Sequence, residues 1–435
     1  MSISNRNEPD VKRERIQSVR GMSDILPGRA KQYVQIESAA RRVFDLYGFQ
    51  EIRTPILESI TLFKRAIGET TDIVEKEMFT LTDRGDRTLC LRPEGTAGIA
   101  RAYIENNLGS NQSLVKLFYI GPMFRAERPQ KGRFREFEQI GCEAFGNSSP
   151  EAEAQMIRMV VQMFGDFGIP FPLLKVNNIG CEICRGPYIE KLRNYLESIS
   201  NNLSETNQRR LVNNPLRVLD SKEDGEQLTD IPLISDYVCD SCKEHFGKVL
   251  NSLSILSVQY RVDPRLVRGL DYYTKSVFEI YPPDRSGSQD ALAAGGRYDN
   301  LVRDMGGPSV PAVGFALGVE RTIAEINNCL DSLKNIDERA GVFVAALGGP
   351  AVQKCVKVVE DLRDASIKTE SILVNNQSLK SQLRFADFLK VRLCVIVGDN
   401  ELANNAAIVR DMISSSQTEV LLPNLVSDIK NRLGA

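Results

Sequence analysis

The stretch FRAERPQKGRFREFEQIGCE, from Phe124 to Glu143, decides the fold class of this chain. Residues typical of β-strands extend outward from both of its ends, over 114–124 and 134–145, and a charged loop containing a glycine joins the two runs. Two such runs with so short a connection predict an antiparallel hairpin. The hairpin carries arginines within apolar sequence, and a guanidinium is costly to desolvate unless it meets an anion. Internal carboxylates or a bound polyanion are therefore expected here.

Two later blocks strengthen this expectation: VRGLDYYTKSVFEI over 267–280 and AVGFALGVERT over 312–322. The second block predicts a helix that begins near Gly318, with an arginine in its first turn. Planar guanidinium groups suit phosphate because they offer two parallel hydrogen bonds. The three blocks together indicate an enzyme that uses a nucleotide, and its candidate arginines are Arg125, Arg133, Arg135, Arg268 and Arg321.

Composition excludes several other classes of protein. A chain of 435 residues predicts two or three domains, and its net charge of −2 excludes a polybasic protein that wraps nucleic acid. We expect no membrane span, because no apolar run approaches the ~20 residues that one needs. The N-terminus resembles neither a signal nor a transit peptide, and nine scattered cysteines indicate a reducing cytoplasm. The single histidine, His245, excludes mechanisms that need two histidines and disfavours a Ser-His-Asp triad.

The motifs resemble those of a known enzyme family. FRAERPQKGRFREFEQ resembles motif 2 of the class II aminoacyl-tRNA synthetases, and GFALGVER resembles their motif 3. RGLDYYT and AAGGRYDNL (Ala293 to Leu301) resemble two blocks of the histidyl-tRNA synthetases, and RPEGTAG (Arg92 to Gly98) resembles that family's amino-acid-binding loop. The resemblance begins at about Val19 and follows the family's order of blocks to the C-terminus.

This resemblance, together with the periodicity of the chain, implies a domain organisation. Residues 1–18 are expected to be a disordered lead, and 19–326 a class II catalytic domain of the α+β type, an antiparallel sheet flanked by helices. A helical insertion is expected over about 175–264, and a polar linker over 327–340. From 341 to 435 strands alternate with helices, which predicts a doubly wound, mostly parallel α/β domain. It resembles the family's anticodon-binding domain.

The segment after the N-terminal lead carries a further expectation. Lys31 to Tyr47 reads as an amphipathic helix, and FQEIRTP follows it as a strand that ends at Pro55. An ordinary helix–strand pair would look the same. Its place upstream of motifs 2 and 3 makes it resemble motif 1, which forms the dimer interface in the family, so a homodimer is expected.

The resemblance also implies an ATP site with Mg²⁺. Arg125 is expected at the α-phosphate and the amino-acid carboxylate. Arg268 is expected beside the α-phosphate, where other class II enzymes place a metal, and these two are the expected catalytic residues. Arg321, at a helix N-terminus, suits the γ-phosphate. A surface salt bridge is the ordinary alternative for any single arginine. The remaining expected ATP-site residues are Glu127, at Mg²⁺ or the adenine amine, Phe137, stacked on adenine, and Arg133.

A histidine pocket is implied beside it. Glu94, Thr96 and Gln139 match the family's ligands of the α-amino group. Glu143 and Tyr273 match the residues that hold the imidazole nitrogens. The pocket is expected to be completed by Tyr272 and Tyr298 as walls, and by Gly295 and Gly296, which permit close backbone approach.

One departure from the family concerns Glu136 and Glu138, where bacterial members commonly carry Gln and His. Strand alternation places Phe137 and Gln139 on one face and these two carboxylates on the other. If that other face approaches the acceptor end of the tRNA, its negative charge weakens RNA contact unless Arg133 or Arg135 compensates.

Two further groups remain open from sequence alone. Cys181, Cys184, Cys239 and Cys242, with His245 three positions on, have the ligand types of a structural zinc site. The gap between the two pairs far exceeds that of a compact zinc finger, so reduced thiols are favoured and no metal is assigned. In the last domain, tRNA-binding candidates are Lys380, Arg384, Lys390 and Arg392, for which a solvated charged face is the alternative.

The resemblance therefore implies a cytoplasmic enzyme of the histidyl-tRNA synthetase family, with ATP, L-histidine and tRNA(His) as its expected substrates. The rival is a non-catalytic regulatory protein. A synthetase-like regulatory subunit of ATP phosphoribosyltransferase resembles this core, but it generally lacks the anticodon domain and has degraded nucleotide-binding motifs. The motif arginines and the last domain are both present here, which argues against that rival.

Overall fold

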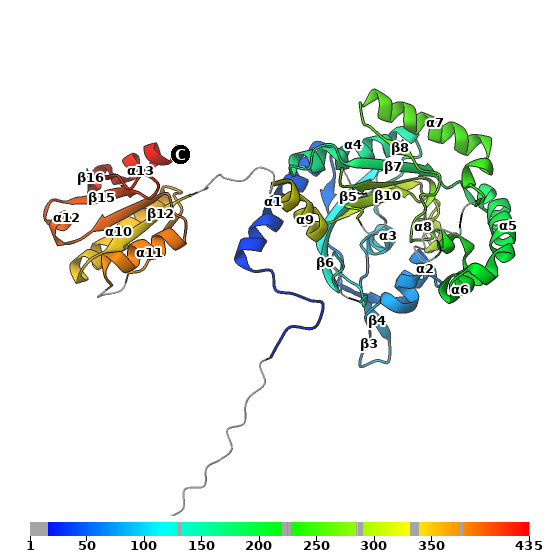
Figure 1. The fold of residues 1–435 in the computed structure, drawn as a ribbon, viewed down its shortest axis with the longest axis horizontal. Helices are drawn as coiled ribbons and strands as arrows, with labels where there is room; N and C mark the ends of the chain where they lie inside the picture. Colours follow the sequence, from blue (N-terminus) through cyan, green and yellow to red (C-terminus); the bar gives the residue numbers. More distant parts are fainter. Residues whose placement is uncertain are drawn as a thin grey trace, which may run out of the picture. The chain divides into compact units, whose positions relative to one another are not determined.

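The computed structural model describes residues 16–110, 112–128, 132–219, 224, 228, 230–283, 285, 290–330, 339–373 and 377–434. The chain forms two compact units, Met1–Leu333 and Lys334–Ala435 (Figure 1). Of the expected N-terminal lead, 1–15 lie outside the described residues, as do 331–338 of the expected linker.

An eight-stranded sheet organises the first unit. Its order is β1-β5-β6-β11-β10-β9-β7-β8, with parallel pairing only at the two edges, between β1 and β5 and between β7 and β8. The strands are β1 (Gln50–Glu51), β5 (Val115–Phe124), β6 (Glu136–Phe145), β11 (Ala312–Gly318), β10 (Ala293–Arg297), β9 (Thr274–Tyr281), β7 (Leu173–Asn178) and β8 (Arg261–Val262). The antiparallel hairpin expected from the sequence is confirmed as β5 and β6, in a register that pairs Phe124 with Glu136.

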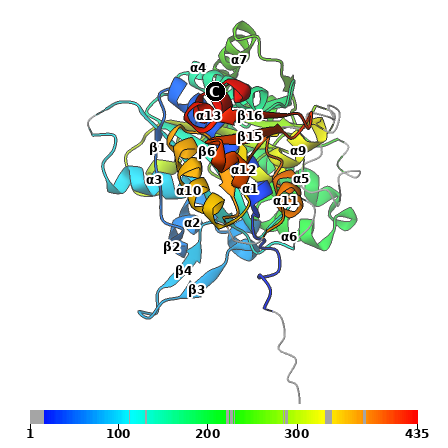
Figure 2. The same cartoon turned by 90° about the vertical axis from the view of Figure 1, so that its left-hand side faces the viewer.

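Helices cover both faces of this sheet, because side chains of alternate strand residues point to opposite faces. One face packs with α1 (Pro27–Leu46), α4 (Pro150–Asp166), α7 (Asp240–Ile255) and α9 (Val319–Leu330). Phe44 of α1 stacks on Phe118 of β5 at the centre of that core, with ring centroids 4.4 Å apart. The other face packs with α2 (Ile60–Ile67), α3 (Thr96–Glu105) and α8 (Leu301–Asp304). A three-stranded sheet, made of β2 (Leu57–Ser59), β4 (Thr88–Leu91) and β3 (Thr80–Thr82), projects from this unit (Figures 1 and 2).

A buried ion pair joins strand β10 to helix α4 in the first unit. Arg297 of β10 is fully buried, and its Nε donates to Glu153 of α4 at 2.8 Å. The same carboxylate lies 2.7 Å from the ring nitrogen Nε2 of His245 on α7. Burying an arginine this deeply is tolerated only where every donor finds an acceptor, and Asp299 and two backbone carbonyls supply the rest.

The structure narrows the helical insertion. Lys175 to Asn178 belongs to β7 of the main sheet, because Leu174 and Val176 bury in the same core as the central strands. The helices are α5 (Glu182–Ser198), α6 (Glu205–Asn213) and α7, and Val249 and Leu253 of α7 pack into the main core with α4. Because β8 (Arg261–Val262) also belongs to the main sheet, the expected limits of about 175–264 were too wide at both ends. Short strands read ambiguously beside helical sequence.

The second unit is built on a five-stranded sheet of order β13-β12-β14-β15-β16. Its strands are β12 (Val342–Ala346), β13 (Thr369–Ser371), β14 (Leu393–Val397), β15 (Ala406–Asp411) and β16 (Gln417–Leu421). Helices α10 (Gly349–Asp364) and α13 (Leu425–Leu433) cover one face, and α11 (Leu379–Phe388) covers the other. The first three strands are parallel, but β15 and β16 are antiparallel to their neighbours, so the expectation of a mostly parallel sheet was wrong. The connection through α12 (Asp399–Ala403) is too short for a parallel crossover.

Length and apolarity together decide whether a helix can cross a bilayer. None of the helices in the described ranges meets both conditions.

Candidate active site

A cavity of about 300 Å³ opens on the face of the large sheet that carries α3. Strands β5, β6, β9, β10 and β11 meet there with the start of α9. The structure brings the side chains expected at the histidine and ATP sites to this cavity, whereas Gly295 and Gly296 are not part of its lining. Its lining includes Glu94, Thr96, Arg125, Glu127, Arg133, Phe137, Gln139, Glu143, Arg268, Tyr272, Tyr273, Tyr298 and Arg321.

Positive charge is concentrated at one end of the cavity. Arg321 stands in the first turn of α9, as expected, and donates to the carbonyl oxygens of Gly132 and Ala291 at 3.1 and 3.0 Å. Burial lowers the pKa of this guanidinium, and the nearby Arg133 and Arg125 lower it further. Like charges held this close destabilise the folded chain unless an anion joins them. This end therefore fits a polyanion.

The carboxylate of Glu127 balances part of that charge. It accepts a hydrogen bond from Arg133 at 2.7 Å and lies 3.9 Å from Arg125. Arg125 also donates to the carbonyl of Pro93 and holds its guanidinium 5.2 Å from the ring centre of Phe137. The rest of the loop, 129–131, lies outside the described residues.

Arg268 also lines the cavity. It forms an ion pair with Glu279 of β9, and its guanidinium lies 5.8 Å from the ring centre of Tyr273. Glu279 also accepts a hydrogen bond from the hydroxyl of Tyr281. The acidic partner fixes the arginine at the cavity wall. Sequence reasoning missed Glu279, although a lone carboxylate within VFEI, an otherwise apolar run, was a usable signal.

The other end of the cavity is a buried acidic pocket. Glu143 is 1% exposed, accepts from the hydroxyl of Thr96 at 2.7 Å, and accepts a second hydrogen bond from the hydroxyl of Tyr298. Burial raises the pKa of Glu143 to about 8, even though these two hydrogen bonds act in the opposite direction. A carboxylate in this state favours a ligand that brings a hydrogen-bond donor or a positive charge.

Glu94 supplies a second buried carboxylate beside the first. Its oxygens accept from the backbone N–H groups of Thr96 and Ala97, both at 2.8 Å, so it caps the start of α3. Burial also raises the pKa of Glu94. Across the pocket, the buried amide oxygen of Gln139 has no hydrogen-bond partner within the part of the chain that the structure describes. Two acidic groups and an unmet acceptor together suit an ammonium group.

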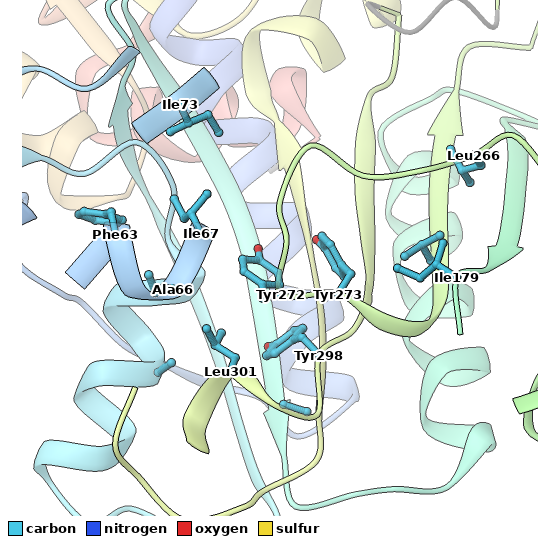
Figure 3. Packing of buried hydrophobic residues seen from close by; sticks show 14 of the residues in the cluster. Phe63, Ala66, Ile67, Ile73, Ile179, Leu266, Tyr272, Tyr273, Tyr298 and Leu301 are labelled. Atoms are coloured by element: carbon cyan, nitrogen blue, oxygen red, sulfur yellow. The ribbon is translucent and has the colours of Figure 1, made fainter. Parts of the chain in front are cut away.

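Three tyrosines close the pocket, as Figure 3 shows for Tyr272, Tyr273 and Tyr298. The ring of Tyr272 lies 4.7 Å from that of Tyr273 and 5.5 Å from that of Tyr298, measured between centroids. All three are buried, and burial raises the pKa of each hydroxyl. Neutral phenols around a carboxylate provide donors of fixed position for a small polar ring.

A glycine that sequence reasoning missed makes room for Glu143. A Cβ added at Gly314 of β11, which pairs with Glu143, would come within 1.8 Å of the carboxylate Oε2. Gly295 and Gly296, which were expected to permit close approach, do so between strands: added Cβ atoms would meet Gly314 O at 2.3 Å and Ser276 O at 2.5 Å. Gly295 and Gly296 therefore permit close packing between strands, whereas Gly314 is the glycine that makes room in the pocket.

The departure at Glu136 and Glu138 lies outside this cavity. Glu136 is exposed, whereas Glu138 is partly buried near Glu37 and Glu320. Burial raises the pKa of Glu138 to about 7, and the two neighbouring carboxylates raise it as well. Arg135, expected as a compensating charge, is instead used in the fold, where it donates to the carbonyls of Glu127 and Arg20 at 3.2 Å each.

The candidates elsewhere in the chain fall into two groups. The sulfur atoms of Cys181, Cys184, Cys239 and Cys242 all lie within 4.8 Å of one another. In the second unit, the candidates Lys380, Arg384 and Lys390 are exposed, whereas Arg392 is engaged by Asp411 at 2.7 Å.

An antiparallel sheet with arginines of motifs 2 and 3 placed to bind phosphate defines a class II aminoacyl-tRNA synthetase. The model of the family described as histidyl-tRNA synthetase matches residues 21–182 and 198–322, and that of an anticodon binding domain matches 341–432. The chain belongs to the histidyl-tRNA synthetase family.

Individual relatives agree over nearly the full length. The histidine–tRNA ligase of Thermodesulfovibrio yellowstonii is 45% identical over 416 residues, which is 95% of this chain and 98% of the relative. That of Syntrophotalea carbinolica is 44% identical over 413 residues, 94% of this chain and 97% of the relative. The crystal structure of apo S. aureus histidyl-tRNA synthetase superimposes with a TM-score of 0.79 at 33% identity, and the match covers 96% of this chain and 100% of that one.

Proposed function

We propose that this protein is a ligase that activates L-histidine with ATP and transfers it to the 3′-terminal ribose of tRNA(His). The observation that carries the proposal is a single cavity with two chemically different ends. Arg125, Arg133 and Arg321 gather at one end, and Glu94 and Glu143 are buried at the other. One end suits a triphosphate and the other suits a small cationic amino acid.

In the first step, a carboxylate oxygen of histidine attacks the α-phosphorus of ATP. The bond between that phosphorus and the bridging oxygen breaks, and pyrophosphate leaves with the electron pair. Both reactants are anions, so charge must be neutralised and the groups held in line. Arg125 and Arg268, which both line the cavity, hold the carboxylate and the α-phosphate. Arg321 binds the γ-phosphate at the start of α9, where the helix dipole adds to its charge.

Mg²⁺ is proposed as the companion of ATP. It neutralises phosphate charge, and Glu127 is the cavity carboxylate that would hold it. The surrounding arginines disfavour a free cation at this place, so the ion would enter together with the phosphates. Phe137 offers a face for adenine once the guanidinium of Arg125 turns toward phosphate.

Selection of histidine rests on groups that an apolar rival would leave without partners. Glu143 accepts the proton-bearing nitrogen of the imidazole, and Tyr273 bonds the other nitrogen, while Tyr272 and Tyr298 bound the ring. Glu94, Thr96 and Gln139 receive the α-amino group. Buried groups left unpaired cost more than a lost methylene contact, so this pocket discriminates strongly.

In the second step, a hydroxyl of the terminal ribose attacks the carbonyl carbon of the adenylate, and AMP leaves. The hydroxyl proton needs an acceptor. His245, the one histidine of the chain, is held by Glu153 in the core outside this cavity. We assign the acceptor to a phosphate oxygen of the adenylate itself.

The second unit supplies the proposed contact with the anticodon. Helix α11 presents Lys380 and Arg384 with two exposed rings, Phe385 and Phe388, whose centroids are 6.1 Å apart. Cationic side chains beside exposed aromatic rings suit single-stranded bases, which stack on rings while their phosphates meet the charges. The aromatic pair was overlooked in the sequence.

A homodimer and a cytoplasmic location complete the proposal. Strand β1 lies at an open edge of the large sheet, and Leu46 and Ile56, on either side of it in the sequence, are 69% and 43% exposed. Exposed apolar side chains beside an open edge favour a protein partner. All nine cysteines are free of disulfides, in keeping with a reducing compartment.

Histidine-dependent exchange of pyrophosphate into ATP tests the first step, and charging of tRNA(His) tests the second. A ligase shows both activities. The rival, a regulatory protein, would bind histidine without exchange, and that result would refute the proposal.

A further inference from the structure

Four cysteine thiols from two distant segments converge in the first unit. Cys184 lies 55 positions before Cys239, yet the backbone N–H of Cys239 donates to the Cys184 sulfur at 3.1 Å. The sulfur of Cys184 is 3.6 Å from that of Cys181 and 3.8 Å from that of Cys242. The long gap had favoured plain reduced thiols, but the fold closes that gap, so the argument from sequence separation no longer holds.

These separations match a tetrahedral metal site. Four sulfurs placed at the usual Zn–S distance of about 2.3 Å stand about 3.8 Å from one another. Sulfurs joined in a disulfide are about 2.05 Å apart, and no pair here is joined. Cys184 and Cys242 are buried, whereas Cys181 and Cys239 are partly exposed, so the four thiols do not come together merely to fill a core.

Both pairs occupy the same position on their helices. Cys181 is the residue before α5 and Cys184 lies in its first turn, while Cys239 and Cys242 stand likewise at the start of α7. Helix N-termini present unpaired backbone N–H groups and a positive dipole, both of which stabilise thiolates. Two helix starts thus direct four sulfurs to one point.

The surroundings hold this geometry in place. Asn178 is buried, and its amide donates to the carbonyl of Cys242 at 2.9 Å while its oxygen accepts from the N–H of Gly180 at 3.0 Å. Gly180 has a φ of +68°, and a Cβ there would come within 2.5 Å of the Cys184 Cβ. His245, the other ligand type in this segment, is bound to Glu153 and does not join the cluster.

We propose that Cys181, Cys184, Cys239 and Cys242 bind one structural Zn²⁺ as four thiolates. Each thiol releases its proton to solvent as it binds, and no electron transfer is involved. Four soft sulfur ligands in a tetrahedral arrangement suit zinc, whose structural sites include sets of four cysteines. No position is left for water, so the ion is structural rather than catalytic.

Hydrogen bonds of Arg185 link the cysteine cluster to the active site. Arg185, next to Cys184, donates to the backbone carbonyls of Asp271 and Tyr273. These carbonyls belong to the segment that carries the pocket tyrosines. Loss of the metal should therefore raise the KM for histidine more than the KM for ATP. This consequence rests on the proposed function, whereas metal binding does not.

Metal content of the full-length protein decides the proposal. The protein is purified under reducing conditions without chelator, then dialysed against ZnCl₂ and finally against metal-free buffer. Mass spectrometry should then find about one zinc per chain. Cys181→Ser and Cys239→Ser should each lower that content to below about a tenth, because three thiolates no longer close the shell. Cys329→Ser is the matched control, a partly exposed cysteine outside the cluster, and should keep its zinc.

A second measurement covers variants that fail to fold. Wild-type protein treated with chelator and titrated with CoCl₂ should develop the thiolate-to-cobalt charge-transfer absorption of a tetrahedral sulfur site, and zinc should abolish it. Zinc retained equally by wild type and both cluster variants would overturn the proposal. So would a wild-type chain that retains none and shows no such absorption. Neither measurement depends on ligase activity, so the failure of either proposal is recognisable by itself.

Discussion

Replacing Glu143 with Gln should weaken the use of histidine, and the loss should grow with pH. The change keeps the shape of the side chain and removes its charge. Thr96 and Tyr298 can keep their contacts, because a hydroxyl can accept a hydrogen bond as well as donate one. The variant should therefore fold, and its defect should lie in the contact with the imidazole.

The magnitude follows from two opposing effects. A hydrogen bond to a charged group contributes ~1.5–3 kcal/mol, which is roughly ten- to a hundredfold in affinity. The pKa of Glu143 is raised to about 8. At pH 7 only about a tenth of the Glu143 side chains are therefore ionised, and binding that needs the ionised form is about tenfold weaker. At pH 7 the variant should then lose at most about tenfold in histidine KM, and near pH 9 the full ten- to hundredfold.

Pyrophosphate exchange measured against histidine and against ATP, at pH 7 and at pH 9, tests this reasoning. At each pH the histidine KM of the variant is divided by that of wild type. Because ionisation of the substrate affects both KM values equally, it drops out of this ratio. Glu138→Gln is the matched control. It removes a carboxylate of the same strand whose pKa is also raised, outside the cavity, and should leave histidine KM unchanged. A ratio that stays constant between the two pH values would refute the role of Glu143.

The same shift predicts a contribution of Glu143 to stability. Its pKa in the folded chain, about 8, lies above the ordinary value of 4.5. The folded state therefore binds the proton more tightly than the unfolded state. This contribution is present in full below the ordinary pKa and is lost as pH rises through the folded one. The melting temperature of the ligand-free wild type should fall more between pH 6 and pH 9 than the melting temperature of Glu143→Gln. Equal falls in the two proteins would contradict the burial argument.

Three further predictions concern the cavity and the second unit. Arg268→Ala should lower exchange by ~10²–10³, since one group on a developing phosphate charge typically contributes that much; its melting temperature should also fall, because Glu279 loses its ion-pair partner, and near-normal exchange would exclude the catalytic assignment. Gly314→Ala should raise histidine KM by roughly tenfold or more through overpacking against Glu143; an unchanged KM would show that the carboxylate moves freely. Removing Lys334–Ala435 should spare part of the exchange activity but lower charging by roughly 10² or more, because a second RNA-binding module is lost; full charging by the truncated protein would disprove the anticodon role.

The hairpin and its arginines could be predicted from sequence because two signals coincided. Alternation in β5 and β6 set the faces, so Phe137, Gln139 and Glu143 share one side, as period two requires. Arg321 was placed in a first helical turn by the change of period near Gly318, and α9 begins at Val319. Local patterns of this kind need no knowledge of distant contacts.

The features that escaped prediction depend on pairings across the sheet. Glu153 lies in the first turn of α4, where an acidic residue is ordinarily solvated, but it is fully buried and meets Arg297 from a strand more than a hundred residues later. Gly314 shows its purpose only beside Glu143 on the neighbouring strand. The cysteine pairs were judged by their sequence separation, whereas the fold brings two helix starts together. No periodicity along one segment reveals such partners.

The presence of a single histidine, His245, has a consequence for protein synthesis in the cell. A ligase for histidine that contains one histidine in 435 residues consumes a single molecule of its own product for each copy translated. When histidine is scarce, ribosomes that make this chain meet one histidine codon, so its synthesis is less exposed to the shortage than that of an average protein. The one position that keeps the residue is a buried contact between α7 and α4, where the ring nitrogen lies 2.7 Å from a carboxylate shared with Arg297.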